Sequence, residues 1–123
     1  MSREEAVLLN ISEGVAVMTL NYPEKANAFD GEMWLALDRA VKAIILDKKV
    51  KAVILTGEGK AFCGGLNLKK VAAEGVNLKK QTLRPGYESL YYLSAVFTAL
   101  EELPVPVIAA IKGGCIGLGF ELA

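Results

Sequence analysis

The sequence has no histidine, only two cysteines, no excess of either charge and no long apolar run. Without imidazole there can be no Ser-His-Asp triad, no Cys-His pair and no His-ligated zinc. The 14 basic and 14 acidic residues give a formal net charge of zero, which argues against nucleic acid or an anionic membrane as the main partner. No run reaches the roughly 18 apolar residues that a membrane-spanning helix needs. We therefore expect no nucleic-acid partner, no membrane span and no metal site.

The two cysteines, Cys63 and Cys115, are far apart in the sequence and form no CxxC motif. We interpret both as small buried residues. Their scarcity is typical of a reducing compartment. The first residues are charged, and no apolar signal core follows them. These features indicate an intracellular location, in the cytoplasm or an organellar matrix.

A chain of 123 residues that is 53% apolar can form one packed domain, burying roughly 65–70% of its unfolded surface. The periodicity predicts mixed α/β structure. We expect a hairpin of strands at 7–11 and 15–20, a helix over 31–46 with Asp30 as its N-cap, and a strand at 52–56. Next we expect a short strand at 61–63, a helix over 67–74 and an exposed loop over 75–86 that carries Lys79, Lys80 and Arg84. A helix over 90–100 and a buried strand at 107–111 complete the prediction.

A weak internal repeat links two of these strands to glycine turns. The segment A-V-I-L-T-G (52–57) leads to C-G-G-L (63–66), and P-V-I-A-A-I (106–111) leads to C-I-G-L-G (115–119). Repeated strand, turn and helix-start units favour a spiral over a single open sheet. Residues 118–123 have the pattern of the first turn of an apolar helix, so we expect either a fragment or an end that something else covers.

The glycine segment at 113–122 follows a strand and opens a helix, which is the position that two phosphate-binding motifs occupy. The spacing G-x-G-x-x-G fails, and no Gly-Lys-Ser/Thr follows, which excludes a Rossmann fingerprint and a Walker A loop. Such turns can also present free backbone N–H groups, because glycines remove the side chains that would block a ligand. Two of them facing one point would form a two-donor oxyanion hole. The alternative is that both turns are only tight connections.

Three motifs in order resemble the crotonase superfamily of enoyl-CoA hydratases and isomerases. They are L-N-Y-P-E-K-A-N-A (20–28), G-K-A-F-C-G-G-L-N-L (59–68), and P-V-I-A-A-I with the glycine segment and E-L (106–122). The resemblance runs from Val7 to the last residue and covers the N-terminal half of these longer proteins. It implies an α/β, crotonase-like spiral of repeated ββα units, truncated after the second glycine turn. Residues 1–123 would then be the N-terminal part of one domain whose C-terminal part is absent.

The resemblance also implies an acyl-CoA thioester as substrate, no further cofactor, and a homo-oligomer, either a trimer or a hexamer. Oxyanion-hole amides would come from Leu66 and Leu118, with Glu121 as the catalytic carboxylate that moves the α-proton. The coenzyme A channel would be lined by Lys25, Ala26, Ala28, Leu66, Asn67, Leu68, Lys69 and Gly117. In this set the Ala28 carbonyl would meet the adenine, and Lys69 would reach a phosphate.

Two departures from the family pattern leave the reaction open. Asn67 stands where the family commonly has Asp, although Asn can still cap a helix. The family's second catalytic acid lies downstream of Glu121, beyond this chain, which leaves hydration incomplete and a one-base isomerisation conceivable. The G-G-C-I-G run (113–117) resembles the dienoyl-CoA isomerase branch. The rival hypotheses are a non-catalytic acyl-CoA-binding or assembly module and a fragment that acts only through interactions.

The aromatic and acidic residues outside these motifs have structural interpretations. We expect Trp34 to lie in the core and Glu101-Glu102 to form a solvated helix face. Tyr87, Tyr91 and Tyr92 have helical spacing, so some should pack against the core and one could border an acyl pocket.

Overall fold

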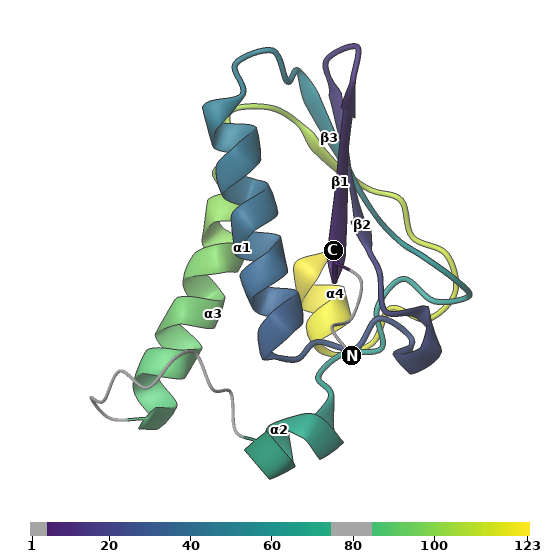
Figure 1. Ribbon diagram of the computed structural model, residues 1–123, viewed down its shortest axis with the longest axis vertical. Helices are drawn as coiled ribbons and strands as arrows, with labels where there is room; N and C mark the ends of the chain where they lie inside the picture. Colours follow the sequence, from purple (N-terminus) through teal and green to yellow (C-terminus); the bar gives the residue numbers. More distant parts are fainter. Residues whose placement is uncertain (1–4, 75–84) are drawn as a thin grey trace.

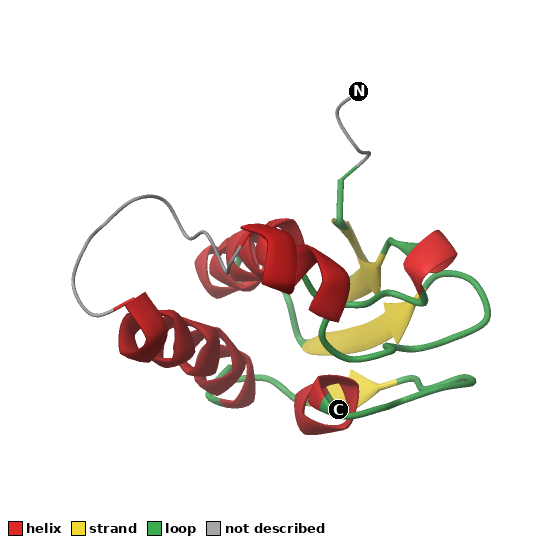
Figure 2. Ribbon diagram, turned by 90° about the horizontal axis from the view of Figure 1, so that it is seen from below, coloured by secondary structure: helices red, strands yellow, loops and turns green. Residues whose placement is uncertain are grey.

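The computed structural model describes residues 5–74 and 85–123. One four-stranded sheet, in the order β1-β2-β3-β4, forms the centre of the molecule. The elements in chain order are β1 (Val7–Ser12), β2 (Val15–Leu20), the 3-10 turn η1 (Pro23–Lys25), α1 (Gly31–Leu46), β3 (Ala52–Gly57), α2 (Leu68–Glu74), α3 (Pro85–Glu101), β4 (Val107–Ala109) and α4 (Leu118–Leu122). Helices α1 and α3 lie along the same side of the sheet (Figures 1 and 2). The mixed α/β class predicted from the sequence is confirmed.

The predicted hairpin is present with the expected turn. Strands β1 and β2 are antiparallel, and Ser12 pairs with Val15 across a two-residue turn. Both turn residues, Glu13 and Gly14, have positive φ angles of 50° and 81°. This backbone matches the twist of a tight β-hairpin. The remaining pairs, β2 with β3 and β3 with β4, are parallel.

Helix α1 begins and ends at the residues that the sequence predicts. Asp30 caps it, because its Oδ1 accepts a hydrogen bond from the Met33 N–H at 2.9 Å. Most apolar residues of α1 recur at helical spacing and are buried against the sheet and α3, whereas Ile45 and Leu46 are 53% and 82% exposed. Trp34 is only 1% exposed, which confirms its predicted core position.

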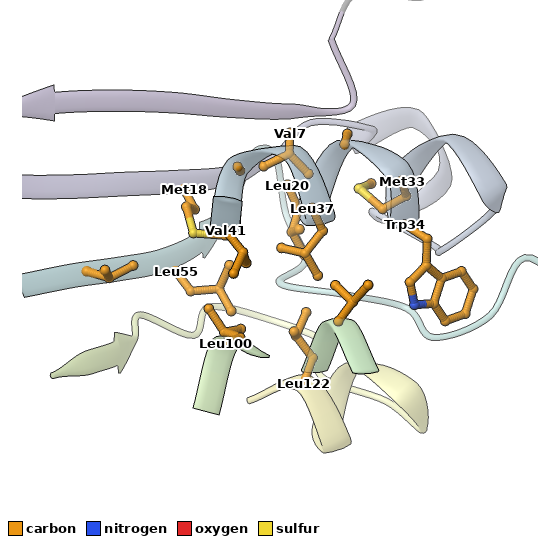
Figure 3. Close-up of a cluster of buried hydrophobic side chains, with 14 of the residues drawn as sticks. Val7, Met18, Leu20, Met33, Trp34, Leu37, Val41, Leu55, Leu100 and Leu122 are labelled. Atoms are coloured by element: carbon orange, nitrogen blue, oxygen red, sulfur yellow. The ribbon is translucent and has the colours of Figure 1, made fainter. Parts of the chain in front are cut away.

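The core fills the space between the helices and the sheet (Figure 3). Met18 and Leu20 of β2 and Leu55 of β3 point toward Leu37 and Val41 of α1. Helices α3 and α4 contribute buried leucines, Leu100 and Leu122 among them. Each fully buried leucine or methionine contributes about 1.5–3 kcal/mol relative to its exposed state. Helix α4 therefore packs into the same hydrophobic core as the sheet.

Three predicted elements differ from the structure. Residues 61–63 form no strand, and only Cys63 makes an isolated bridge. Helix α3 begins at Pro85, earlier than predicted, and β4 ends at Ala109 rather than at residue 111. Ile108 and Ile111 are 56% and 49% exposed, so the prediction of a buried strand is wrong. The reason is that β4 is an edge strand and, among the described residues, Ile108 lies on the uncovered face of the sheet.

The predicted loop over 75–86 falls mostly outside the described residues. Lys79, Lys80 and Arg84 belong to that part, whereas Pro85 and Gly86 open α3. In the described ranges no helix has the length and apolar character needed to cross a bilayer.

Candidate functional site

The two glycine turns run side by side in parallel. The N–H groups of Phe62 and Cys63 donate to the Gly114 carbonyl at 3.0 and 3.1 Å, and the Ile116 N–H donates to the Cys63 carbonyl at 3.0 Å. Cys63 and Cys115 are partners in this bridge. Since β3 and β4 are also parallel neighbours, the two copies of the sequence repeat are stacked along their length.

Two glycines allow this close approach. Gly65 has φ +95°, and a Cβ placed on it would lie 3.0 Å from the Ile116 carbonyl oxygen and 3.9 Å from the Leu118 nitrogen. A Cβ on Gly119 would lie 2.5 Å from the Cys63 carbonyl oxygen. Any side chain at either position would push the turns apart. The backbone of Gly65 is therefore close to the Leu118 amide, with room for less than one side chain between them.

The amides of Leu66 and Leu118 differ from their neighbours in hydrogen bonding. Gly64 and Asn67 donate to the carbonyls of Ala26 and Phe29, both at 2.8 Å. Within the described part of the chain, the Leu66 and Leu118 N–H groups have no such internal acceptor. Leu118 is the first residue of α4, and the first amides of a helix have no intrahelical partner. Both residues are half-buried.

Glu121 lies one helical turn after Leu118, on the same face of α4. Its side chain is exposed and lines a cleft of about 700 Å³ between α3, α4 and β4. Ser94, Thr98 and Glu101 line the cleft from α3. The predicted solvated face at Glu101-Glu102 is confirmed, since both residues are exposed, yet Glu101 shares this cleft with Glu121.

Asn27 joins the first motif to the first glycine turn. It is fully buried, with its Oδ1 accepting from the Tyr22 N–H at 2.7 Å. Its Nδ2 donates to the carbonyls of Glu58, Ala61 and Phe62 at 2.9, 2.9 and 3.2 Å. No functional role was predicted for Asn27, although its place in a polar run between a strand and a helix could have indicated one. Together with the Gly64 N–H, which donates to the Ala26 carbonyl, Asn27 holds the 22–28 segment against the turn.

The residues predicted to bind coenzyme A lie on both sides of this junction. Lys25, Ala26 and Lys69 are exposed, Leu68 is 72% exposed, and Ala28 is half-buried. Asn67 caps α2, because its Oδ1 accepts from the Lys70 N–H at 3.2 Å. The structure thus brings residues 25–28 and 66–69 together. Gly117, with φ +54°, is the N-cap of α4.

An ion pair anchors α2 to the start of α1. Lys70 Nζ lies 3.0 Å from Asp30 Oδ2, and the Asp30 side chain is only 1% exposed. Asp30 therefore caps α1 with one carboxylate oxygen and binds α2 with the other. Since α2 begins two residues after Leu66, this pair fixes the direction in which the chain leaves the first glycine turn.

The cysteines and tyrosines near these elements carry further polar contacts. Burial raises the pKa of the Cys63 thiol. Burial and the adjacent Asp38 carboxylate raise the pKa of Tyr92 to about 12, and its hydroxyl donates to Asp38 at 3.0 Å. Tyr91 is 70% exposed, and the Tyr87 side chain lies outside the described part. Among the described residues no group of three Cys, Asp or Glu side chains could hold a metal ion.

Comparison with known proteins gives consistent matches along the chain. The family model described as enoyl-CoA hydratase/isomerase matches residues 10–123. A protein of Rhodobacter capsulatus named probable enoyl-CoA hydratase is 42% identical in an alignment of 120 residues that covers 92% of this chain and 40% of that protein. The mouse mitochondrial Δ(3,5)-Δ(2,4)-dienoyl-CoA isomerase is 34% identical, over 97% of this chain and 38% of its own length.

Solved structures agree on the fold. The structure titled as an enoyl-CoA hydratase/carnithine racemase from Magnetospirillum magneticum has a TM-score of 0.82 and 30% identity, covering 98% of this chain and 44% of its own. The predicted crotonase-like α/β fold is confirmed. The chain spans less than half the length of each relative and structure that it is compared with here.

Proposed function

Because the chain belongs to the enoyl-CoA hydratase/isomerase family, we propose that the protein containing it acts on an acyl-CoA thioester. In this proposal the N–H groups of Leu66 and Leu118 bind the thioester carbonyl oxygen and stabilise its enolate. The observation that carries the proposal is the contact between the turns, where a Cβ on Gly65 would lie 3.9 Å from the Leu118 nitrogen. A single oxygen atom between the turns could therefore accept from both amides.

Two fixed amides suit the chemistry of the thioester. Removing the α-proton transfers negative charge to the carbonyl oxygen, and donors already held in place stabilise that charge without reorganising. The loss of one such donor typically costs about 2.7–4 kcal/mol of barrier height. The bridge between Cys63 and Cys115 supplies the rigidity, because it couples the two turns by main-chain hydrogen bonds. No cofactor beyond the coenzyme A thioester is required.

Glu121 is proposed as the general acid/base. Its exposure and its position one turn from Leu118 on α4 support a carboxylate beside the α-carbon when the carbonyl is held by the amides. Proton transfer by a positioned side chain contributes about 10²–10⁴-fold in rate. A relative named as a hydratase and one named as an isomerase both match this chain.

The coenzyme A moiety is proposed to lie along Lys25, Ala26, Ala28 and residues 66–69. The Ala26 carbonyl already accepts from the Gly64 N–H at 2.8 Å. The Ala28 carbonyl accepts no hydrogen bond from another described residue, which supports it as the acceptor for the adenine amino group. Exposed Lys69 on the first turn of α2 is a donor for a phosphate.

The test is Glu121→Gln, assayed on an enoyl-CoA and on a dienoyl-CoA with the protein that contains this chain. Loss of the general acid/base should lower kcat by about 10²–10⁴-fold, with little change in KM. Glu101→Gln is the matched control, because Glu101 lines the same cleft from α3. Unchanged turnover in Glu121→Gln, or an equal loss in Glu101→Gln, would remove Glu121 from the mechanism. Acyl-CoA binding without turnover by the unmodified chain would favour the non-catalytic binding module.

A homo-oligomer, trimer or hexamer, is also proposed. Ile108, Ile116 and Phe120 are 56%, 63% and 74% exposed, and large exposed apolar side chains favour association. Light scattering on the preparation used for the assays tests this, and a monomer at assay concentration would contradict it.

A further inference from the structure

The two cysteines are neighbours in space although they are far apart in sequence. They are direct partners in the parallel bridge between the glycine turns. The Cys63 N–H donates to Gly114 at 3.1 Å, and the Cys63 carbonyl accepts from Ile116 at 3.0 Å. Paired segments of a sheet lie about 4.8 Å apart, and disulfides join Cα atoms about 4.4–6.8 Å apart. The backbone therefore places the pair within disulfide range.

Both side chains also meet at one residue, Gly119. The Cys115 thiol donates to the Gly119 carbonyl at 3.4 Å. A Cβ on Gly119 would lie 2.8 Å from the Cys63 Cβ. Gly119 therefore contacts both cysteine side chains. Both thiols are free in the structure, Cys63 buried and Cys115 half-buried.

We propose that Cys63 and Cys115 form an oxidisable thiol pair, and that a peroxide converts them to an intramolecular disulfide across the two glycine turns. Half-buried Cys115 reacts first: its sulfur attacks one peroxide oxygen, the O–O bond breaks, and a sulfenic acid and water form. The Cys63 sulfur then attacks the sulfenic sulfur, the S–O bond breaks, and a second water leaves. Two thiols and one hydrogen peroxide thus give one disulfide and two waters. A dithiol reductant reverses the reaction.

The order of reaction follows from the surroundings of each thiol. Cys63 is fully buried, and its thiol donates to the Asn27 carbonyl at 3.3 Å. Burial raises its pKa, so it stays protonated and reacts slowly with an external oxidant. A sulfenic acid on Cys115 forms next to the Cys63 thiol, so the two groups can react without any external reagent entering the core. Cys115 is therefore the peroxide-reactive residue and Cys63 the resolving one.

The disulfide would act directly on the proposed oxyanion turns. Forming it removes the thiol hydrogens that bond the Asn27 and Gly119 carbonyls. Cys63 and Cys115 also lie at equivalent places, each three residues before Leu66 and Leu118 respectively. The oxidation itself depends only on the bridge geometry and is independent of the proposed function.

The experiment treats the folded 123-residue chain with hydrogen peroxide, alkylates the remaining thiols and measures intact mass. We expect a monomer that has lost two hydrogen atoms, resists alkylation at both cysteines and is restored by dithiothreitol. Tryptic mapping should join the peptides containing Cys63 and Cys115. In urea the link should form more slowly, because unfolding separates the two thiols.

Two single variants test the order of the steps. Cys63→Ser should stop at a sulfenic acid on Cys115 that dimedone captures, whereas Cys115→Ser should leave Cys63 largely unmodified. Disulfide-linked dimers through Cys115 would overturn the proposal. So would overoxidation of Cys115 in the unmodified chain while Cys63 still accepts the alkylating reagent.

Discussion

Replacing Asn27 with alanine removes all the side-chain hydrogen bonds that join residues 22–28 to residues 58–62. The amide donates to the carbonyls of Glu58, Ala61 and Phe62 and accepts from the Tyr22 N–H. The variant therefore leaves four main-chain groups, one N–H and three carbonyls, without this partner. Asn27 is 0% exposed, so the groups that lose this partner lie in the interior of the molecule.

The expected loss of stability can be estimated from these contacts. An unsatisfied buried polar group costs about 1–3 kcal/mol, and of the four contacts the one with the Phe62 carbonyl is fully buried. Asn27 also has φ +55°, a left-handed conformation that costs other residues about 1–2 kcal/mol. Because Tyr22 is only half-buried, we expect Asn27→Ala to lower the free energy of unfolding by about 3–5 kcal/mol. Domains of this kind are stable by about 5–15 kcal/mol.

The assay is urea unfolding, followed by circular dichroism and by the fluorescence of Trp34, which is the single tryptophan and is 1% exposed. Asn27→Gly separates the two causes: glycine tolerates positive φ, so it should be about 1 kcal/mol less destabilising than alanine. Asn10→Ala, at an exposed position of β1, is the matched control and should change stability by less than about 0.5 kcal/mol. If Asn27→Ala lowered the free energy of unfolding by less than about 1 kcal/mol, the Asn27 amide would not be what joins residues 22–28 to residues 58–62.

Two further substitutions test the ion pair and the tyrosine. Lys70→Met should destabilise by about 1–3 kcal/mol, because it leaves the buried Asp30 carboxylate without this cation. Lys42→Met, at a 68% exposed lysine, should cost less than about 1 kcal/mol, and equal losses in the two variants would contradict the argument. Tyr92→Phe removes the hydrogen bond to Asp38 and should cost about 1–2 kcal/mol at neutral pH. Since the folded pKa of Tyr92, about 12, exceeds the unfolded value of 10.0, this stabilisation is complete below pH 10 and is lost between pH 10 and 12. The difference from the unmodified chain in urea unfolding should therefore shrink over that range, and a constant difference would refute the shift.

Elements whose ends are set by local chemistry were predictable from the sequence. Asp30 supplies the N-cap of α1, and the turn at Glu13-Gly14 fixes the hairpin register. The start of α3 was missed because Pro85-Gly86 was interpreted as a loop, although proline is common in the first turn of a helix. The exposure of Ile108 was missed for another reason. Strand propensity reports a half-buried pleated surface and does not reveal which face another element covers.

For the candidate site, too, local sequence patterns predicted the individual turns but not how they align in space. The glycines marked both turns, and the repeat indicated that they correspond. Their alignment is not uniform, because Val53 pairs with Val107 while Cys63 pairs with Cys115. The first copy thus has two more residues between strand and turn than the second (63 − 53 against 115 − 107). No local sequence pattern specifies where in the structure these two additional residues are accommodated.

The excess residues lie where Asn27 binds. Between β3 and the bridge, the chain passes through Gly59 with φ +83°, and the Asn27 amide binds the carbonyls of Glu58 and Ala61 on either side. The extra length is therefore taken up as a loop held by one buried side chain from the 22–28 segment. The Ala26 carbonyl of that segment also accepts a hydrogen bond from the Gly64 N–H. Contacts of this one segment therefore position both the proposed coenzyme A surface and the first glycine turn. Shortening the loop or removing the amide should therefore displace both together.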